Sequence, residues 1–587
     1  MLAGLDVGGT FTDAALVDGK SGRCIAWVKA PTRTGAVLPG ILESLERLLR
    51  ESRADARTVK RLTVSSTLGL NALLTGNTRP VGVLALPGPG IDPALFWPRD
   101  PLFRVLPGAQ DHRGRVTAAP DPKAVGAALE SLKKLGAKAL AIVCKFSPKN
   151  PELEKSLAAE ARKIFGADTP IVLGFETSGS LNFPRRLHTA WCNAALCAVS
   201  RDFHRDLEKA SRDLGLTCPI HILKADAGSF SATEALRDPA STMGSGPAAG
   251  LLGILAMARP SGTDSPLFGA ADKYMIDMGG TSTDIALLAA GQPLLAREGL
   301  TVSGRPTLIR TLWTRSIALG GDSALRCKNG EVSIGPDRSG PALSLDPEQK
   351  DAPFSRPATL TDALNVLDIA RVGDTHLSRH AFMRMIDDPA CPPAVKNGQA
   401  DPEDQSRALA RLFLAGALRR IKEKTSEILE EINSQPVYTI RELLVDKKLE
   451  PECAMFIGAP AGALRAELEK ALVLPVVAPE ESPFANALGA ALARPTKAAE
   501  LYADTLLGRM TIPDFRVEKN IGSDYRLEDA GRDMSRAFAE AFRDEEPGQA
   551  QTVFAESFAV LDPSGRRGRI LRIRSQYAAG LVLKGEG

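Results

Sequence analysis

The sequence of 587 residues predicts an α/β protein with more than one domain, because a chain of this length exceeds what one hydrophobic core usually supports. Apolar segments of strand length alternate with amphipathic segments of helix length through most of the chain. The glycine-rich phrase LDVGGTFTD at residues 5–13 returns as IDMGGTSTD at residues 276–284, which indicates two related halves. From residue 499 the pattern changes to an amphipathic helix followed by long strand-like segments, which indicates a small C-terminal α+β domain.

The chain opens with a predicted hairpin. The apolar segments LAGLDV and AALVDG flank Gly8 and Gly9, and Asp18-Gly19 supplies a further turn. The tripeptide GKS that begins at Gly19 resembles the end of a phosphate-binding P-loop, but such a loop would need a glycine where Ala14 stands. A hairpin turn is therefore the better interpretation of this tripeptide.

Further elements follow in order along the chain. The pattern predicts helices at residues 36–51, from Thr67 and at residues 151–166, and strands at residues 61–66, 81–86 and 138–146. Residues 330–360 are rich in Pro, Gly, Ser and Asp and are predicted as loop, and a long helix is predicted from Gln405 to about Asn433. The C-terminal domain is predicted to hold a helix at residues 526–543 and strands at residues 552–561 and 568–583.

Composition disfavours several classes of function. The net charge of +3 is too small to indicate a polyanionic partner such as nucleic acid. The first residues lack the basic region and apolar run of a signal peptide, and the longest apolar runs are too short to span a bilayer. We therefore expect a cytoplasmic protein without membrane association. The eight cysteines are scattered without a CxxC pair and are expected to be free thiols.

The repeated phrase suits phosphate binding. Each copy consists of an apolar strand that ends in Asp, a turn of two glycines and hydroxyl residues, and a second apolar strand. Glycines let backbone N–H groups approach phosphate oxygens, threonine hydroxyls add donors, and aspartates can hold a hydrated magnesium ion. Two such turns can clamp one polyphosphate from opposite sides. The alternative is a pair of ordinary tight hairpins, which explains one copy equally well but does not explain the repetition.

These residues resemble the actin, Hsp70 and sugar kinase superfamily of ATPases, in which two ribonuclease H-like domains close around ATP and each supplies a phosphate hairpin. Residues 244–256 and 485–493, rich in Gly and Ala, are similar to the interdomain helices of that superfamily, and FIGAPAG at residues 456–462 is similar to its adenosine-binding loop. Each segment is also consistent with an ordinary tightly packed helix or loop. The resemblance implies an actin-like ATPase fold.

The same resemblance implies a division of the chain. Residues 1–240 would form the first ATPase domain and residues 241–498 the second, with a cleft between them. Residues 499–587 would form the small C-terminal domain.

Within the superfamily, the resemblance narrows to the A-type members of the hydantoinase/oxoprolinase family, over about residues 1–495. It rests on GLDVGGTFTD at the start, SSTLGLNALL at 65–74, MGSGPAAG at 243–250, YMIDMGGTSTDIAL at 274–287, SIALGGDS at 316–323 and PATLTDALNVL at 357–367. The family includes N-methylhydantoinases, 5-oxoprolinases and subunits of acetone or acetophenone carboxylases. The resemblance implies that ATP phosphorylates a carbonyl oxygen of a cyclic amide, or of a ketone enolate in the carboxylases. It also implies a B-type partner subunit, a homo-oligomer, or both.

The resemblance assigns roles to individual residues. Asp6 and Asp277 would position Mg²⁺, and Asp13 or Asp284 could orient the attacking group. The expected ATP contacts are Gly8, Gly9, Thr10, Thr12, Gly279, Gly280, Thr281, Thr283, Gly320, Gly321, Gly458 and Gly462, with Asp322 near nucleotide or substrate. Asp362 is a further polar candidate, although an Asp before an amphipathic helix is at least as consistent with an N-cap.

The sequence departs from the family on the expected substrate side. A segment that commonly reads HGTTVATNALL is VSSTLGLNALL here, so that Val64 or Ser65 stands at the histidine position. A GGGS motif is replaced by GGDS at residues 320–323. These changes favour, modestly, an alternative function as a nucleotide-switched protein that binds, activates or reactivates a partner.

Two other patterns are weak. His376 and His380 stand four residues apart, but the acidic residue of a zinc motif such as HExxH is missing, so a solvated helix face is the better interpretation. Cys192 and Cys197 lie among apolar residues and are expected in the core.

Overall fold

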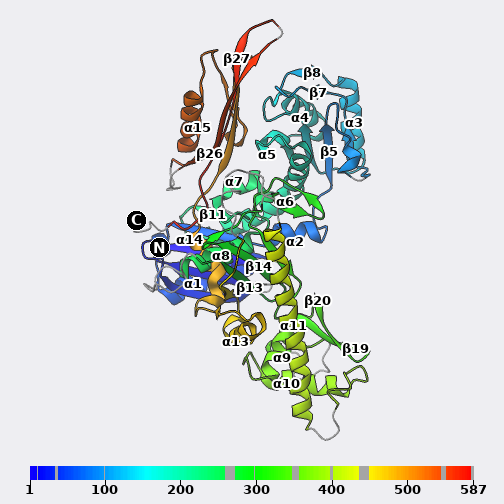
Figure 1. The fold of residues 1–587 in the computed structure, drawn as a ribbon, viewed down its shortest axis with the longest axis vertical. Helices are drawn as coiled ribbons and strands as arrows, with labels where there is room; N and C mark the ends of the chain where they lie inside the picture. The colour runs from blue at the N-terminus through cyan, green and yellow to red at the C-terminus, as the bar shows by residue number, and fades with distance from the viewer. Residues whose placement is uncertain are drawn as a thin grey trace.

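A computed structural model places two related six-stranded sheets in the body of the molecule (Figure 1). It describes residues 1–9, 11–32, 37–97, 99–257, 271–296, 298–346, 356–396, 401–434, 448–543, 550–562 and 564–582. The first sheet has the order β12-β11-β4-β1-β2-β3 and consists of β1 (Leu2–Val7), β2 (Phe11–Val17), β3 (Cys24–Pro31), β4 (Arg61–Ser66), β11 (Ile220–Leu223) and β12 (Ser229–Ser231). The second has the order β15-β14-β13-β21-β22, with β18 beside β14, and consists of β13 (Lys273–Met278), β14 (Thr283–Ala289), β15 (Gln292–Pro293), β18 (Thr314–Ile317), β21 (Cys453–Ile457) and β22 (Val476–Val477).

Both sheets repeat one arrangement of strands. An antiparallel hairpin forms the centre of each sheet, β1 with β2 in the first and β13 with β14 in the second. A parallel strand, β4 or β21, lies beside the first strand of the hairpin. An antiparallel strand, β3 or β18, lies beside the second strand. The predicted α/β fold with two related halves is therefore confirmed.

Two helices of small residues lie between the sheets, α8 (Ser245–Met257) and α14 (Ala485–Leu492). Their buried side chains form one cluster with side chains from both central hairpins. A Cβ atom on Gly253 would lie 2.2 Å from the carbonyl oxygen of Ala485, and one on Gly489 would lie 2.0 Å from a backbone oxygen of α8. The close helix packing expected for these two segments is present, and it requires glycine at the crossing.

A separate parallel sheet interrupts the first half of the chain. It has the order β10-β9-β5-β6 and consists of β5 (Val81–Leu86), β6 (Phe103–Val105), β9 (Ala139–Cys144) and β10 (Ile171–Leu173). One face packs against α3 (Pro122–Lys134) and α4 (Glu152–Phe165), and the other against the first part of α6 (Phe183–Asp213). The last part of α6 packs on the first six-stranded sheet, so this one helix joins the two layers (Figure 1).

The C-terminal residues form an antiparallel sheet covered on one face by a helix. The sheet has the order β25-β24-β23-β27-β26 and consists of β23 (Ala498–Asp504), β24 (Arg509–Ile512), β25 (Val517–Asn520), β26 (Gln551–Leu561) and β27 (Arg567–Gln576); the helix is α15 (Leu527–Ala541). In Figure 1 this sheet stands beside the sheet of β5 and β9. The predicted strand at residues 568–583 ends early, because the chain turns away after β27 and the Leu581 side chain packs in the cluster around α8 and α14.

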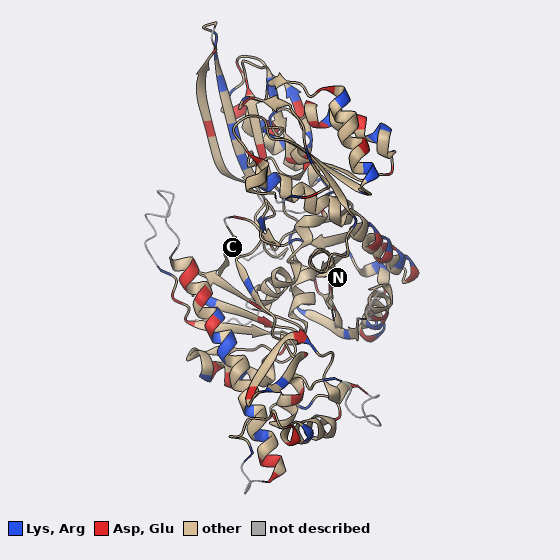
Figure 2. Ribbon diagram, turned by 90° about the vertical axis from the view of Figure 1, so that its right-hand side faces the viewer, with Lys and Arg blue, Asp and Glu red and all other residues tan. Residues whose placement is uncertain are grey.

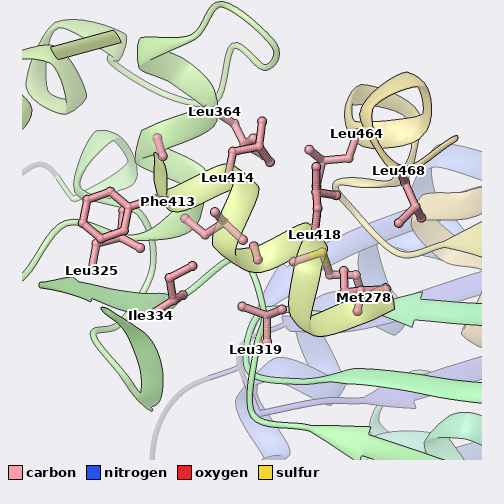
Figure 3. Close-up of a cluster of buried hydrophobic side chains, with 14 of the residues drawn as sticks. Met278, Leu319, Leu325, Ile334, Leu364, Phe413, Leu414, Leu418, Leu464 and Leu468 are labelled. Atoms are coloured by element: carbon pink, nitrogen blue, oxygen red, sulfur yellow. The ribbon is translucent and has the colours of Figure 1, made fainter. Parts of the chain in front are cut away.

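The second half has its own core below the sheet. The long helix α11 (Pro402–Asn433) packs its apolar side against α13 (Ala461–Leu472), α9 (Leu360–Val366) and α10 (Thr375–Asp387). Figure 3 shows Leu418 of α11 beside Met278, at the end of β13, with Leu464 of α13 nearby. This core therefore supports the strand that carries the second glycine-rich phrase. Along the helices, Lys and Arg positions are interspersed with Asp and Glu positions (Figure 2).

The prediction of a loop at residues 330–360 is wrong for the first part of this segment. Residues Glu331–Arg338 form β20, which pairs with β19 (Ser323–Lys328) across the turn of Asn329 and Gly330. Both turn residues have positive φ angles, +53° and +78°, which Asn-Gly tolerates best. The Asn-Gly dipeptide before an alternating segment was the signal for this hairpin.

The remaining predicted helices are confirmed at α1 (Val37–Ser52), α2 (Leu68–Leu74), α4, α11 and α15. The GKS tripeptide lies in the β2–β3 turn, where Asp18 Oδ1 accepts hydrogen bonds from the backbone of Lys20 and Ser21. Shorter elements are α5 (Gly174–Thr177), α7 (Ala232–Arg237), β7 (Ala109–Gln110), β8 (Val116–Ala118), β16 (Thr301–Val302) and β17 (Arg305–Pro306). Within the described ranges, no helix has both the length and the apolar character that a bilayer crossing needs.

Candidate active site between two phosphate hairpins

The two glycine-rich phrases fold into equivalent hairpins. Asp6 on β1 lies opposite Asp13 on β2, and Asp277 on β13 lies opposite Asp284 on β14. The turns also match, since the Gly8 N–H donates to the Phe11 carbonyl at 3.0 Å and the Gly279 N–H donates to the Ser282 carbonyl at 3.0 Å. The two copies of the repeated phrase therefore adopt the same backbone geometry.

Asp6 and Asp277 meet at one side chain from a third element. Asn486, in the first turn of α14, donates from Nδ2 to Asp277 Oδ2 at 3.1 Å and to Asp6 Oδ2 at 3.4 Å. Burial, followed by the charges of Asp13 and Asp277, raises the pKa of Asp6 to about 7. Burial, followed by the charge of Asp284, raises the pKa of Asp277 to about 7. The two hairpins thus bring several carboxylates close together, and their negative charges repel one another.

The second aspartate of each hairpin has a different neighbour in the two halves. Lys29 on β3 lies opposite Asp13 and donates from Nζ to Asp13 Oδ2 at 2.7 Å. Ser316 on β18 takes the matching place opposite Asp284. Burial raises the pKa of Asp13, although Lys29 opposes this shift, and burial raises the pKa of Asp284 to about 6. The Lys29 ammonium also lowers the pKa of Asp277, so its charge acts on both hairpins.

The predicted phosphate contacts of the turns differ in exposure. Gly9, Gly279 and Thr281 are exposed at the turns, with Gly8 and Gly280 partly buried beside them. Thr10 lies outside the described residues.

The second threonine of each phrase is engaged within the fold. Thr12 and Thr283 are fully buried. The Thr12 hydroxyl shares a hydrogen bond of 2.9 Å with the Thr32 hydroxyl, and the Thr283 hydroxyl donates to the Leu319 carbonyl at 2.6 Å. Exposed backbone of the turns is therefore better placed to meet a phosphate than these two hydroxyl groups.

The GGDS segment lies directly on the second hairpin turn. The Gly321 N–H donates to the Gly279 carbonyl at 3.0 Å, and the Asp322 N–H donates to the Gly280 carbonyl at 2.7 Å. A Cβ atom on Gly320 would lie 2.4 Å from the Gly280 carbonyl oxygen. Glycine at position 320 is needed for this contact, which fixes the shape of the turn.

The expected adenosine loop follows β21, the strand beside β13. Gly458 has φ of +99°, and a Cβ atom there would lie 2.1 Å from the Met278 carbonyl oxygen. Only glycine satisfies both conditions. Gly462 lies in the first turn of α13, where a Cβ atom would meet nothing within 4 Å, so it leaves open space beside the helix.

Comparison with protein families covers most of the chain. The family described as Hydantoinase/oxoprolinase matches residues 186–499, and the Hydantoinase/oxoprolinase N-terminal region matches residues 2–165. The chain belongs to the hydantoinase/oxoprolinase family. The match to the N-terminal region extends from the first hairpin to the sheet of β5 and β9. The match at residues 186–499 includes the second hairpin, α8 and α14.

Individual relatives place the chain within this family. It is 29% identical over 266 residues to the 5-oxoprolinase of Saccharomyces cerevisiae, covering 44% of this chain and 19% of that protein. It is 24% identical over 362 residues to the caprolactamase alpha subunit of Pseudomonas jessenii, covering 57% of this chain and 50% of that protein. The chain therefore matches half or less of the length of these relatives.

Solved structures show the same fold over nearly the whole chain. A nucleotide-free structure of acetone carboxylase, an enzyme of ATP-dependent acetone carboxylation, matches with a TM-score of 0.71 at 16% identity, over 98% of this chain and 87% of that one. The ATP-dependent caprolactamase from Pseudomonas jessenii matches with a TM-score of 0.66 at 19% identity, over 99% and 88%.

The hairpin aspartates of this hydantoinase/oxoprolinase family member fit a hydrated magnesium ion. Asp6 Oδ1 is buried and has no hydrogen-bond partner among the described residues. Mg²⁺ usually takes one or two carboxylates and completes its shell with water and phosphate oxygens. Asp6 and Asp277 are the residues that would hold the ion.

Sequence reasoning missed Lys29 and Asn486. Asn486 lies inside a segment whose small residues predict a packing helix, and Lys29 lies on the strand after the first hairpin. Lys29 is the only lysine of β3, but the register that sets it opposite Asp13 on β2 is seen only in the structure. No local signal identifies Asn486.

Asp362 has a structural environment rather than a catalytic one. The N-cap of α9 is Thr359 and not Asp362. Asp362 lies three residues later, where its side chain completes a capping box with Thr359. Its buried carboxylate also accepts from the Leu343 N–H at 3.0 Å and the Ser378 hydroxyl at 2.7 Å.

The other weak patterns agree with their structural interpretations, except that Cys197 is only partly buried, at the edge of the core. His376 and His380 are exposed on α10. Cys192 is buried on α6, and burial raises the pKa of its thiol to about 12, which disfavours a thiolate nucleophile. All eight cysteines are free thiols, as expected.

Proposed function

We propose that this chain is the ATP-dependent subunit of an enzyme that phosphorylates the carbonyl oxygen of a cyclic amide, of the hydantoin or 5-oxoproline type, and so drives ring opening. The observation that carries the proposal is the meeting of Asp6 and Asp277, from two equivalent hairpins, at Asn486. Family membership and the names of the relatives 5-oxoprolinase and caprolactamase support a cyclic amide as substrate.

The proposed chemistry overcomes the resistance of an amide to water. Resonance stabilises the amide, and phosphorylation of its oxygen removes much of that resonance and creates a leaving group. A bond forms between the carbonyl oxygen and the γ-phosphorus, while the bond from that phosphorus to the bridging oxygen of ADP breaks. The protein's contribution is to position the reactants and neutralise charge.

Residues of this chain divide that work. Backbone N–H groups at the equivalent positions Gly9 and Gly280 would contact phosphate oxygens, and Lys29 would neutralise charge between the hairpins. A magnesium ion at Asp6 and Asp277 would supply further charge neutralisation. Asp284 is not assigned to the ion, and because burial raises the pKa of its carboxyl to about 6, it is placed to orient the attacking group and accept a proton near neutral pH.

We propose that a B-type partner receives the activated substrate. The relative from Pseudomonas jessenii is named as an alpha subunit, and the present chain matches half of its length. Self-association of the chain is a second candidate assembly.

A nucleotide-switched binding or reactivating protein is the second candidate. It is favoured by the residues that depart from the family pattern, because they are engaged internally. The Ser65 hydroxyl lies 3.4 Å from the Ser245 hydroxyl, and Asp322 pairs with Arg338 at 3.1 Å. An ATP-dependent ketone carboxylase subunit is the remaining alternative within the family.

ATP hydrolysis measured against a panel of substrates tests the proposal. The panel contains hydantoin, N-methylhydantoin, 5-oxoproline, caprolactam and acetone, each with and without a candidate B-type partner. Stimulation by a cyclic amide supports the first candidate, and stimulation by acetone alone supports a carboxylase. ATP binding without stimulation by any of these compounds contradicts the amidase and the carboxylase for these substrates. It favours the nucleotide-switched binding or reactivating protein.

A further inference from the structure

A second site lies outside the phosphate hairpins. A cavity of about 190 Å³ opens between the sheet of β5 and β9 and the C-terminal sheet. No residue of either glycine-rich phrase lines it. Its walls come from the β7–β8 turn, the segment after β9, and strands β23, β24 and β27.

The cavity is strongly cationic. Its charged lining consists of Arg113, Arg115, Lys149, Arg509 and the carboxylate Asp504. With Asp111, which pairs with Arg115 beside the cavity, two of the four positive charges remain uncompensated. The whole chain carries a net charge of only +3. A surplus of this size in one cavity creates a strong local potential for anions.

Two of the four cations have carboxylate partners. Arg113 binds Asp504 through two hydrogen bonds of 2.7 Å, and this pair joins the two sheets. Arg115 donates from Nε to Asp111 at 2.7 Å. The carboxylate of Asp504 also accepts from the N–H groups of the segment that follows it, so it is fully occupied.

Lys149 and Arg509 lack a carboxylate partner among the described residues. Lys149 Nζ donates to the His112 carbonyl at 2.9 Å and lies 5.6 Å from the ring centre of Tyr502. Arg509 is partly buried and makes no ion pair within the described part of the chain. Burial lowers the pKa of Lys149, the charges of Asp504 and Asp111 oppose this shift, and Arg572 and Arg113 lower the pKa further. A partly buried ammonium among arginines is costly unless an anion joins it.

We propose that this cavity binds a small anion bearing carboxylate or phosphate groups, held by Lys149 and Arg509. Arg113 and Asp504 form the fixed floor of the site, and Arg115 lies at its edge. Arginine offers a planar fork of donors that matches both carboxylate and phosphate oxygens, and lysine adds a point charge.

Calorimetric titration of the full chain tests this site. Inorganic phosphate and glutarate are the two probes, and both titrations contain magnesium and a saturating non-hydrolysable ATP analogue, so that the hairpin site is filled. We expect saturable binding of at least one probe. Lys149→Met and Arg509→Gln should each weaken it about tenfold or more, because each removes a charge-assisted hydrogen bond.

Arg205→Gln is the matched control, since Arg205 is an exposed arginine of α6 that pairs with Asp202. It should leave the affinity unchanged. Binding of phosphate alone identifies a phosphorylated ligand, and binding of glutarate alone identifies a carboxylate.

Two results would overturn the site: no saturable binding of either probe, or the same loss of affinity in Arg205→Gln as in Arg509→Gln. The melting temperature of each variant checks that it is folded, and the partly exposed Arg509 decides the outcome if Lys149→Met is unstable. Since the probes are titrated without substrate, the result is independent of the proposed amide chemistry.

Discussion

Asp6 and Asp277 are protonated more easily than ordinary aspartates because they are buried near other carboxylates. Burial disfavours the charged form, and each neighbouring carboxylate disfavours it further. Such an arrangement costs stability in the free protein. It is retained, in our proposal, because magnesium and phosphate chemistry require the carboxylates together.

Asp277→Asn should reduce the dependence of stability on pH. The folded protein holds the Asp277 proton up to about pH 7, whereas the unfolded carboxyl titrates near 3.8. The contribution of this protonated carboxyl to the free energy of unfolding is fully present below pH 3.8 and is lost as the pH rises through 7. We expect the melting temperature of the nucleotide-free wild type to fall more steeply across this window than that of the variant. Asp202→Asn is the control, and parallel curves for Asp277→Asn and wild type would contradict the pKa assignment.

Lys29→Met should lower the turnover of ATP. The variant loses the charge that pairs with Asp13 and acts on Asp277, while the length of the side chain is kept. Loss of one preorganised group that stabilises developing charge costs about 100-fold or more in kcat. Lys60→Met, at an exposed position, should retain wild-type kcat. Equal activity in both variants would remove Lys29 from the proposed site.

At the scale of elements, the packing of α8 against α14 sets the distance between the hairpins. Both helices lie between the two sheets, and α14 also carries Asn486. Their approach is closer than side chains larger than hydrogen would allow at Gly253 and Gly489.

Gly253→Ala should destabilise the protein, whereas Gly126→Ala should not. The added methyl group at position 253 would lie 2.2 Å from a backbone oxygen, and overpacking of this kind costs about 1–3 kcal/mol. Gly126 lies within α3 and a methyl group there meets nothing within 4 Å, so alanine should stabilise by up to about 1 kcal/mol. Urea unfolding of both variants measures the difference. A stable Gly253→Ala protein would show that the crossing can relax.

At the scale of the whole molecule, the site depends on contacts between distant parts of the chain. Asp6 lies near the N-terminus, Asp277 lies on the first strand of the second hairpin, and Asn486 lies in α14, which precedes the C-terminal sheet in the chain. A ligand that joins the hairpins should therefore stabilise the entire fold.

Magnesium and a non-hydrolysable ATP analogue should raise the melting temperature of the wild type. Binding to the folded state alone stabilises by about 2.7 kcal/mol at a hundredfold excess over the dissociation constant. EDTA should reduce the shift, because the phosphate charge would then face the carboxylates without a cation. Asp277→Ala should remove the shift and the ATP turnover while remaining folded. Retained turnover in Asp277→Ala would refute the role of this residue.

Local patterns in the sequence were sufficient for most elements and for the two hairpins. Each of these patterns, such as strand alternation, a Gly-Gly turn or a helix-terminal residue, spans only a few neighbouring positions. The sequence alone is therefore sufficient to detect it. The β19–β20 hairpin was missed because the proline and glycine content of residues 330–360 outweighed the Asn-Gly turn at positions 329 and 330.

The sequence alone thus determined the α/β fold class, the duplicated hairpins, the small-residue helices and the family resemblance, because each is written in adjacent or repeated residues. Only the tertiary structure brought Asn486 between Asp6 and Asp277 and set Lys29 beside Asp13. Only the tertiary structure, likewise, enclosed Lys149 and Arg509 in one cationic cavity. The physical reason is that these charges interact across separate strands and sheets, and their distances follow from packing of the whole chain rather than from any local pattern.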